Sequence, residues 1–147
     1  MDVESALSTA VDEVLDKMAF LFFEELDTPV GDDAFKFITE VNVNGVVKGR
    51  LNILVSQEAA VEVARNLIGI REDDELYDET LMDSLKEFTN LVMGRTMTVL
   101  NPAGPFDMEV PSVVDKPTDG MDGHKTIRKL GGLDEAPICF QLHYIED

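Results

Sequence analysis

The chain has 147 residues, the size of a single domain, and we expect one domain over residues 1–147. Thirty acidic residues against twelve basic ones give a net charge of -18 at pH 7, which disfavours nucleic acids and anionic membrane surfaces as partners. No stretch approaches the roughly 20 consecutive apolar residues of a membrane span, and acidic residues near the N-terminus stand where a secretory signal carries positive charge, so we expect a cytoplasmic protein.

The first half of the chain begins with the pattern of a long helix and a β-hairpin. Apolar residues recur three and four positions apart over residues 4–26, which predicts an amphipathic helix that ends at Asp27-Thr28-Pro29. Two strands are predicted over residues 35–43 and 46–55. They flank Asn44-Gly45, a dipeptide that suits the two positive-φ positions of a type I′ turn.

Two further helices follow the hairpin. Ser56 can cap the start of a helix over residues 57–67, and Gly69 can end it. An acid-rich connector over residues 71–83 then leads into a helix over residues 81–100. After a break at NPAGP, three strand candidates follow, over residues 106–114, 124–130 and 136–145.

This order of elements predicts the fold class. Strands and helices do not alternate strictly, as they would in a parallel α/β fold. We therefore expect an α+β fold in which two long helices and a shorter one pack on a mostly antiparallel sheet. A helix followed by a hairpin occurs twice, which suggests an internal duplication.

Cysteine and histidine offer little chemistry. Cys139 is the single cysteine and lies in an apolar run, so we expect a core residue and exclude a disulfide or a cysteine metal site within one chain. His124 and His143 lie in different strands without a third ligand at useful spacing, so we expect no metal. The acidic, glycine-containing segment over residues 115–123 lacks the EF-hand spacing and is predicted to be a hairpin loop.

The helix predicted over residues 81–100 has two distinct faces. At about 100° per residue, its apolar side chains cluster in one sector: Leu81, Leu85, Phe88, Val92 and Val99. Four residues, which we call the polar stripe, lie on nearly the opposite side: Asp83, Glu87, Asn90 and Gly94. Asn and Gly are poor helix formers, and Gly costs about 1 kcal/mol relative to Ala. The polar stripe is therefore either a functional surface or a solvated face on which Gly94 permits a close helix contact.

Glu87 and Asn90 form a carboxylate–amide pair on this stripe. They are three positions apart in the helix, so their Cβ atoms lie about 5 to 6 Å from each other. The pair lacks the second carboxylate, histidine or nucleophile that acid–base catalysis on a small molecule requires. It would suffice to complete another protein's site, because the amide could orient a water toward a phosphoryl group while the carboxylate pairs with a lysine of that protein.

The segment Asp83-Ser-Leu-Lys-Glu87-Phe-Thr-Asn90, followed by Gly94 and Pro111, resembles the motif of the CheC, CheX and FliY phosphatase family. In that motif an Asp or Ser precedes a Glu by four positions, an Asn follows the Glu by three, and a Pro comes about twenty residues later. The resemblance implies a phosphatase that removes the aspartyl phosphate of the chemotaxis response regulator CheY. Asn90 would position the attacking water, Glu87 would engage a lysine of the regulator, and Asp83 and Gly94 would contact this partner. The chain would need no cofactor of its own, because Mg²⁺ would belong to the receiver domain.

The first helix decides whether the chain holds one such site or two. An offset of 74 places Glu13 and Asp16 opposite Glu87 and Asn90. Asp16 cannot donate a hydrogen bond as an amide does, and its charge would repel phosphoryl oxygens. We therefore predict that the first helix is structural and that the chain is CheX-like, with one active pair. The resemblance to CheX also implies a homodimer.

Two alternatives stay open at this point. The same fold could be a non-catalytic docking module that binds a receiver domain or a flagellar switch component through the same helix. The chain could also be a small-molecule binding domain with an unrelated pocket, although no sequence feature marks such a pocket.

Overall fold

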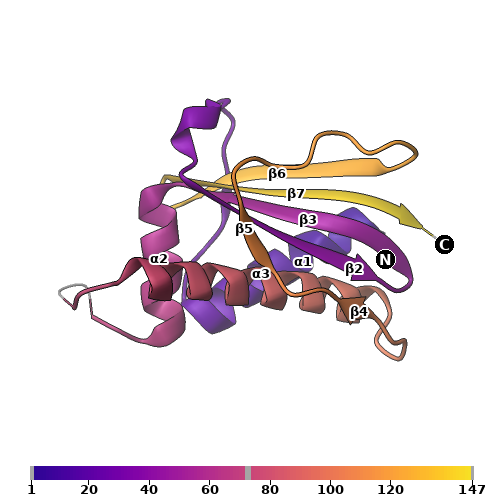
Figure 1. The fold of residues 1–147 in the computed structure, drawn as a ribbon, viewed down its shortest axis with the longest axis horizontal. Coiled ribbons are helices and arrows are strands. Elements are labelled where there is room, and N and C mark those ends of the chain that lie inside the picture. The colour runs from indigo at the N-terminus through magenta and orange to yellow at the C-terminus, as the bar shows by residue number, and fades with distance from the viewer. Residues whose placement is uncertain (1, 72–73, 147) are drawn as a thin grey trace.

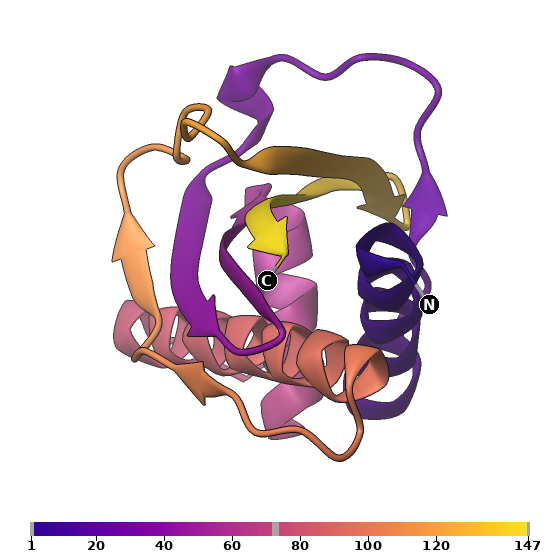
Figure 2. The same cartoon turned by 90° about the vertical axis from the view of Figure 1, so that its right-hand side faces the viewer.

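Three helices pack against one face of a curved sheet, which confirms the predicted α+β class (Figure 1 and Figure 2). The computed structural model describes residues 2–71 and 74–146. Its helical elements are α1 (Val3–Val14), the π-helical turn η1 (Leu15–Ala19), the 3-10 helix η2 (Asp32–Ala34), α2 (Gln57–Ile68) and α3 (Asp78–Leu100). Its strands are β1 (Glu24–Glu25), β2 (Phe37–Asn44), β3 (Val47–Val55), β4 (Asp107–Met108), β5 (Ser112–Val114), β6 (Lys125–Leu133) and β7 (Ala136–Glu146).

The strand order shows an internal symmetry. The antiparallel sheet runs β1-β6-β7-β3-β2-β4, and β5 also pairs with β2. The two long hairpins, β2–β3 and β6–β7, meet at the centre of the sheet, where Leu51 lies opposite Leu142. Exchanging α1, β1, β2 and β3 for α3, β4/β5, β6 and β7 gives the same order read from the opposite edge of the sheet. The topology therefore supports the predicted duplication, with α2 as the element outside it.

The core lies between the sheet and the helices. Inward-facing residues of β3 and β7 alternate along each strand and meet the apolar faces of α1, α2 and α3. The rings of Phe88 on α3 and Phe140 on β7 are both fully buried, with centroids 6.2 Å apart. α3 contacts both α1 and α2, so it is held from two sides as well as from the sheet. None of the helices in the described part of the chain is long and apolar enough to cross a membrane.

The prediction of one helix over residues 4–26 is wrong in its C-terminal part. α1 and η1 end at Phe20, whose φ of 54° is left-handed, and the chain then continues extended into β1. Phe22, which lies within the predicted amphipathic helix, is 77% exposed. The edge of β6 supplies the backbone partners of this segment, and periodicity along the chain does not reveal them. Gly131 permits the approach, because a Cβ there would lie 2.5 Å from the carbonyl oxygen of Glu24.

The β2–β3 hairpin is confirmed, but its predicted type I′ turn is wrong. Neither Asn44 nor Gly45 has a positive φ. Gly45 serves close packing instead, because a Cβ there would lie 2.8 Å from the Cβ of Phe106. Two consecutive positive-φ residues, as a type I′ turn requires, occur between β6 and β7, at Asp134 (φ 51°) and Glu135 (φ 72°).

The boundaries of α2 follow the sequence closely. The side chain of Ser56 accepts a hydrogen bond from the Ala59 N–H at 3.2 Å, and Gly69 ends the helix with a φ of 70°. α3 begins at Asp78 rather than at the predicted residue 81, because the acidic connector supplies favourable residues to its first turn. Residues 72–73 of that connector lie outside the described residues.

The predicted strand over residues 106–114 is split into β4 and β5. Both strands pair with β2, but the segment 109–111 between them is one residue longer than the opposing segment 41–42. Pro111 at this bulge has no N–H to donate, which accounts for the interruption. The segment therefore pairs with β2 in two short stretches, β4 and β5. β5 also contacts α3.

Candidate functional site

α3 carries the polar stripe, and its opposite face is anchored in the core. Leu81, Leu85, Phe88 and Val92 are buried as predicted, whereas Val99 is only half-buried. Met93 and Met97 are also buried and fill the core beside them. Because one face of the helix is fixed in this way, the rotation of α3 about its axis is fixed as well, and the stripe points outward.

A buried hydrogen bond also holds the turn of α3 that carries Glu87 and Asn90. The hydroxyl of Thr89 donates to the carbonyl oxygen of Leu85 at 2.8 Å, so it accepts from the hydroxyl of Thr39 on β2, 2.6 Å away. Both threonines are fully buried, so this contact is shielded from water. Thr89 lies between Glu87 and Asn90 in sequence, and its bond to the sheet fixes the turn that presents them.

The structure brings the four stripe residues onto successive turns of one helix face. Asp83 and Glu87 are exposed, while Asn90 and Gly94 are half-buried. Within the described part of the chain, the side chains of Glu87 and Asn90 form no hydrogen bond or ion pair. An anchored backbone with free polar ends is the arrangement that can complete a site on another molecule.

Gly94 is not explained by packing within the chain. Among the described residues, a Cβ at this position would meet only the terminal methyl of Met108, at an ordinary contact distance of 3.6 Å. The alternative that Gly94 permits a close contact between helices is therefore wrong for this structure. The small residue leaves room on the outer surface of α3 beside Asn90.

A groove runs beside the stripe between α1 and α3, and we call it the Asn90 groove. Its volume is about 510 Å³. It is lined by residues from both helices, from η1 and from the segment before β4: Glu13, Val14, Lys17, Asn90, Leu91, Gly94, Arg95, Thr98 and Phe106. Asn90 is half-buried and forms part of this wall, whereas Glu87 is exposed.

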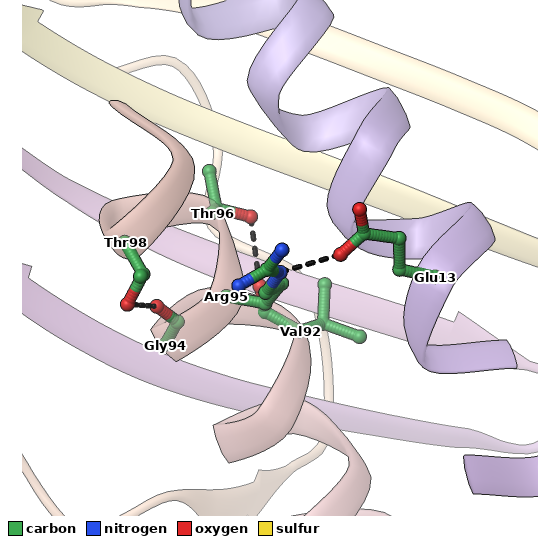
Figure 3. Close-up of polar contacts among 6 residues, drawn as sticks. All are labelled: Glu13, Val92, Gly94, Arg95, Thr96 and Thr98. Atoms are coloured by element: carbon green, nitrogen blue, oxygen red, sulfur yellow. Dashed lines mark hydrogen bonds and ion pairs between the residues drawn. The ribbon is translucent and has the colours of Figure 1, made fainter. Parts of the chain in front are cut away.

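An ion pair between two residues of the groove lining joins the two helices (Figure 3). The Nε of Arg95 donates to the Oε2 of Glu13 at 2.5 Å, joining α3 to α1. This hydrogen bond and the positive charges of Arg95 and Lys17 hold the pKa of Glu13 below its ordinary value. Arg95 and Lys17 were not singled out from sequence. The ion pair of Arg95 joins residues 82 positions apart, and the groove that Lys17 lines forms only when the two helices pack together.

The counterpart of the pair on the first helix has a different environment. Glu13 is engaged by Arg95, and Asp16 lies in η1, where the helix widens into a π turn. These contacts fit a structural role for the first helix. That α1 holds no active pair stays a prediction, as do the roles of the four stripe residues.

Polar residues on the sheet, away from α3, form hydrogen bonds within the fold. His143 is 3% exposed, and its Nδ1 lies 2.8 Å from the Thr126 hydroxyl and its Nε2 lies 3.0 Å from the Thr118 carbonyl oxygen. Thr118 thereby ties the connection between β5 and β6 across the outer face of the sheet. Across residues 2–71 and 74–146, no three His, Cys, Asp or Glu side chains are grouped as a metal site would require. Cys139 is buried and free, as predicted.

Similar proteins share this fold along nearly the whole chain. No curated protein sequence matches the chain. The chemotaxis protein CheX of Desulfovibrio desulfuricans is 16% identical, with a TM-score of 0.77 over 99% of this chain and 100% of that one. CheX of Borrelia burgdorferi, in a structure with CheY, BeF3 and Mg²⁺, is 21% identical, with a TM-score of 0.76 over 99% of each chain. FliY of Thermotoga maritima is 15% identical, with a TM-score of 0.59 over 96% of this chain and 84% of that one.

The sequence match to a family is more specific than the shared fold. Residues 37–125 match the family model described as chemotaxis phosphatase CheX. The matched segment is more than half of the chain, and it includes α3 with the complete polar stripe and Pro111. The chain therefore belongs to the chemotaxis phosphatase CheX family.

Proposed function

We propose that this protein is a CheX-type phosphatase that hydrolyses the aspartyl phosphate of a CheY-type receiver domain. One observation carries the proposal: among the described residues, the side chains of Glu87 and Asn90 have no polar partner, and they lie on the outer face of a helix whose other face is buried in the core. Membership of the CheX family and the complex of a fold relative with CheY support the choice of partner. A cytoplasmic location is part of this proposal.

The proposed chemistry needs only two groups from this chain. The amide of Asn90 orients a water in line with the phosphoryl group, and the carboxylate of Glu87 pairs with a lysine of the receiver. The water oxygen forms a bond to phosphorus while the bond between phosphorus and the aspartyl oxygen breaks. The products are the free aspartate and inorganic phosphate. Mg²⁺ held by the receiver offsets the charge that develops on the phosphoryl oxygens.

The test is phosphate release from phosphorylated CheY in the presence of Mg²⁺. Asn90→Ala should slow release by about 100-fold, because the attacking water loses its orientation. Asn44→Ala is a matched control, since it removes an exposed amide at the hairpin tip. Equal rates for wild type and Asn90→Ala would refute the catalytic assignment.

A docking module without catalysis is the second candidate. It is favoured by the composition of the Glu87/Asn90 pair, which offers one carboxylate and one amide but no nucleophile and no acid–base pair. In that case the receiver would bind without faster loss of its phosphoryl group. Glu87→Lys should abolish binding under both candidates, because it places a cation against the receiver's lysine.

We also propose a homodimer, as the resemblance to CheX implies. β6 spans Lys125–Leu133 but pairs with β1 only at Gly131 and Gly132. Among the described residues the N-terminal part of β6 thus presents an open strand edge, which is a surface that a second copy can extend. Light scattering coupled to size-exclusion chromatography would give the mass in solution. A monomeric mass at working concentrations would refute the dimer.

A further inference from the structure

The Asn90 groove adjoins the proposed catalytic pair directly. Asn90 and Gly94 belong both to the polar stripe and to the lining of the groove. Any protein that covers Asn90 closely must therefore also cover the groove. Val14, Leu91 and Phe106 give it an apolar interior, and its volume lies within the range of ordinary binding pockets.

The charge at the groove differs from that of the chain as a whole. Two basic side chains, Lys17 and Arg95, and one acidic side chain, Glu13, line it in a chain with a net charge of -18. A neighbouring groove of about 470 Å³ shares Glu13 and Lys17 but adds Asp12 and Asp16, so it is net acidic. Of these two grooves, the one that Asn90 lines therefore has the positive balance.

Lys17 is the cation available to a partner. Arg95 already bonds to Glu13, whereas Lys17 is exposed and forms no ion pair within the described residues. A receiver that carries a phosphoryl group meets the repulsion of a strongly acidic protein. Local cations beside Asn90 lower that repulsion at the place where the two proteins must meet.

We propose that the Asn90 groove is a second contact for the phosphorylated receiver and determines its affinity. It accepts an apolar side chain from the receiver surface beside the phosphorylation site, and a carboxylate next to that side chain pairs with Lys17. This inference rests on the proposed function and adds a specificity element to it. Glu87 and Asn90 act at the phosphoryl group, while the groove selects which receiver is held there.

Two variants test the charge and the shape of the Asn90 groove separately. Lys17→Glu reverses the exposed charge, and Thr98→Phe fills the groove from its half-buried lining. Both should raise KM for the phosphorylated receiver, by about tenfold for Lys17→Glu, and leave kcat unchanged. Lys17→Glu should also make KM fall more steeply as ionic strength rises, because it adds to a repulsion that salt screens. Lys116→Glu, an exposed lysine after β5, is the control with the same change in charge, and KM should not change.

The measurements are phosphate release at varied receiver concentration and the Kd of the receiver by fluorescence anisotropy. Circular dichroism melting verifies that each variant is folded. If wild type releases no phosphate, the proposed function fails, and the Kd values still test the groove. If Thr98→Phe is folded and leaves both KM and Kd unchanged, the groove is not covered by the receiver and the inference is overturned. Equal effects of Lys17→Glu and Lys116→Glu would overturn the role of Lys17.

Discussion

Gly94→Ala should move stability and receiver binding in opposite directions. Gly in a helix interior is about 1 kcal/mol less favourable than Ala, and α3 continues for a full turn beyond Gly94. The added methyl would lie 3.6 Å from the terminal methyl of Met108, so it meets no clash. The free energy of unfolding should rise by about 1 kcal/mol, which is about 3 °C in Tm for a chain of this size.

Receiver binding should weaken in the same variant. The new Cβ stands on the outer face beside Asn90, where we propose that the receiver packs closely. A loss of about 1.4 kcal/mol corresponds to a tenfold higher Kd. Gly69→Ala is the matched control: its methyl also meets no clash, since no described residue lies within 4 Å of it, but the backbone φ is 70°. That variant should lower stability by about 1 kcal/mol and leave Kd unchanged.

The assays are thermal melting and fluorescence anisotropy with the labelled receiver. An unchanged or lower Tm for Gly94→Ala would refute the view that this glycine is a cost to the helix. A higher Tm with an unchanged Kd would show that the receiver surface does not reach Gly94. Only a more stable fold together with a weaker complex supports the view that Gly94 serves contact with the receiver.

Three further predictions concern the scaffold. Thr89→Val leaves the buried hydroxyl of Thr39 without its partner and should cost about 1–3 kcal/mol in urea unfolding, whereas adding Thr39→Val should recover part of that loss. Burial raises the pKa of the Cys139 thiol to about 11, so this thiol should resist maleimide until the chain unfolds. Above pH 9.0 the unfolded chain loses this proton first, so the free energy of unfolding should fall by up to about 1.4 kcal/mol per pH unit until about 11. Replacing Asp134-Glu135 by Asn-Gly should raise Tm, because both φ values are positive and Asn and Gly avoid much of the roughly 1–2 kcal/mol that a left-handed conformation costs most other residues.

The elements with strong local signals were predictable from the sequence. Ser56 and Gly69 delimit α2 because a cap and a left-handed end need only their immediate neighbours. The polar stripe of α3 was predictable for the same reason, since a helix of fixed period places Glu87 and Asn90 on one face wherever the helix lies.

Errors arose where a distant segment competes with a local preference. Residues 20–26 have a helical pattern, but the edge of β6 offers backbone hydrogen bonds that draw Glu24 and Glu25 into a strand. Asn44-Gly45 has the composition of a type I′ turn, yet Phe106 and Met97 pack so closely on Gly45 that its lack of a Cβ serves contact instead of a positive φ. Neither partner is visible from the residues around the turn.

The sequence by itself determined the α+β class, the two caps of α2 and the face of α3 that carries Glu87 and Asn90, because each depends on periodicity or on adjacent residues. Only the tertiary structure decided what surrounds that face. Packing α1 against α3 pairs Glu13 with Arg95 and brings Lys17 and Asn90 into the lining of one groove. Contacts between residues so far apart in the chain arise from how the helices pack on the sheet, and no local pattern specifies them.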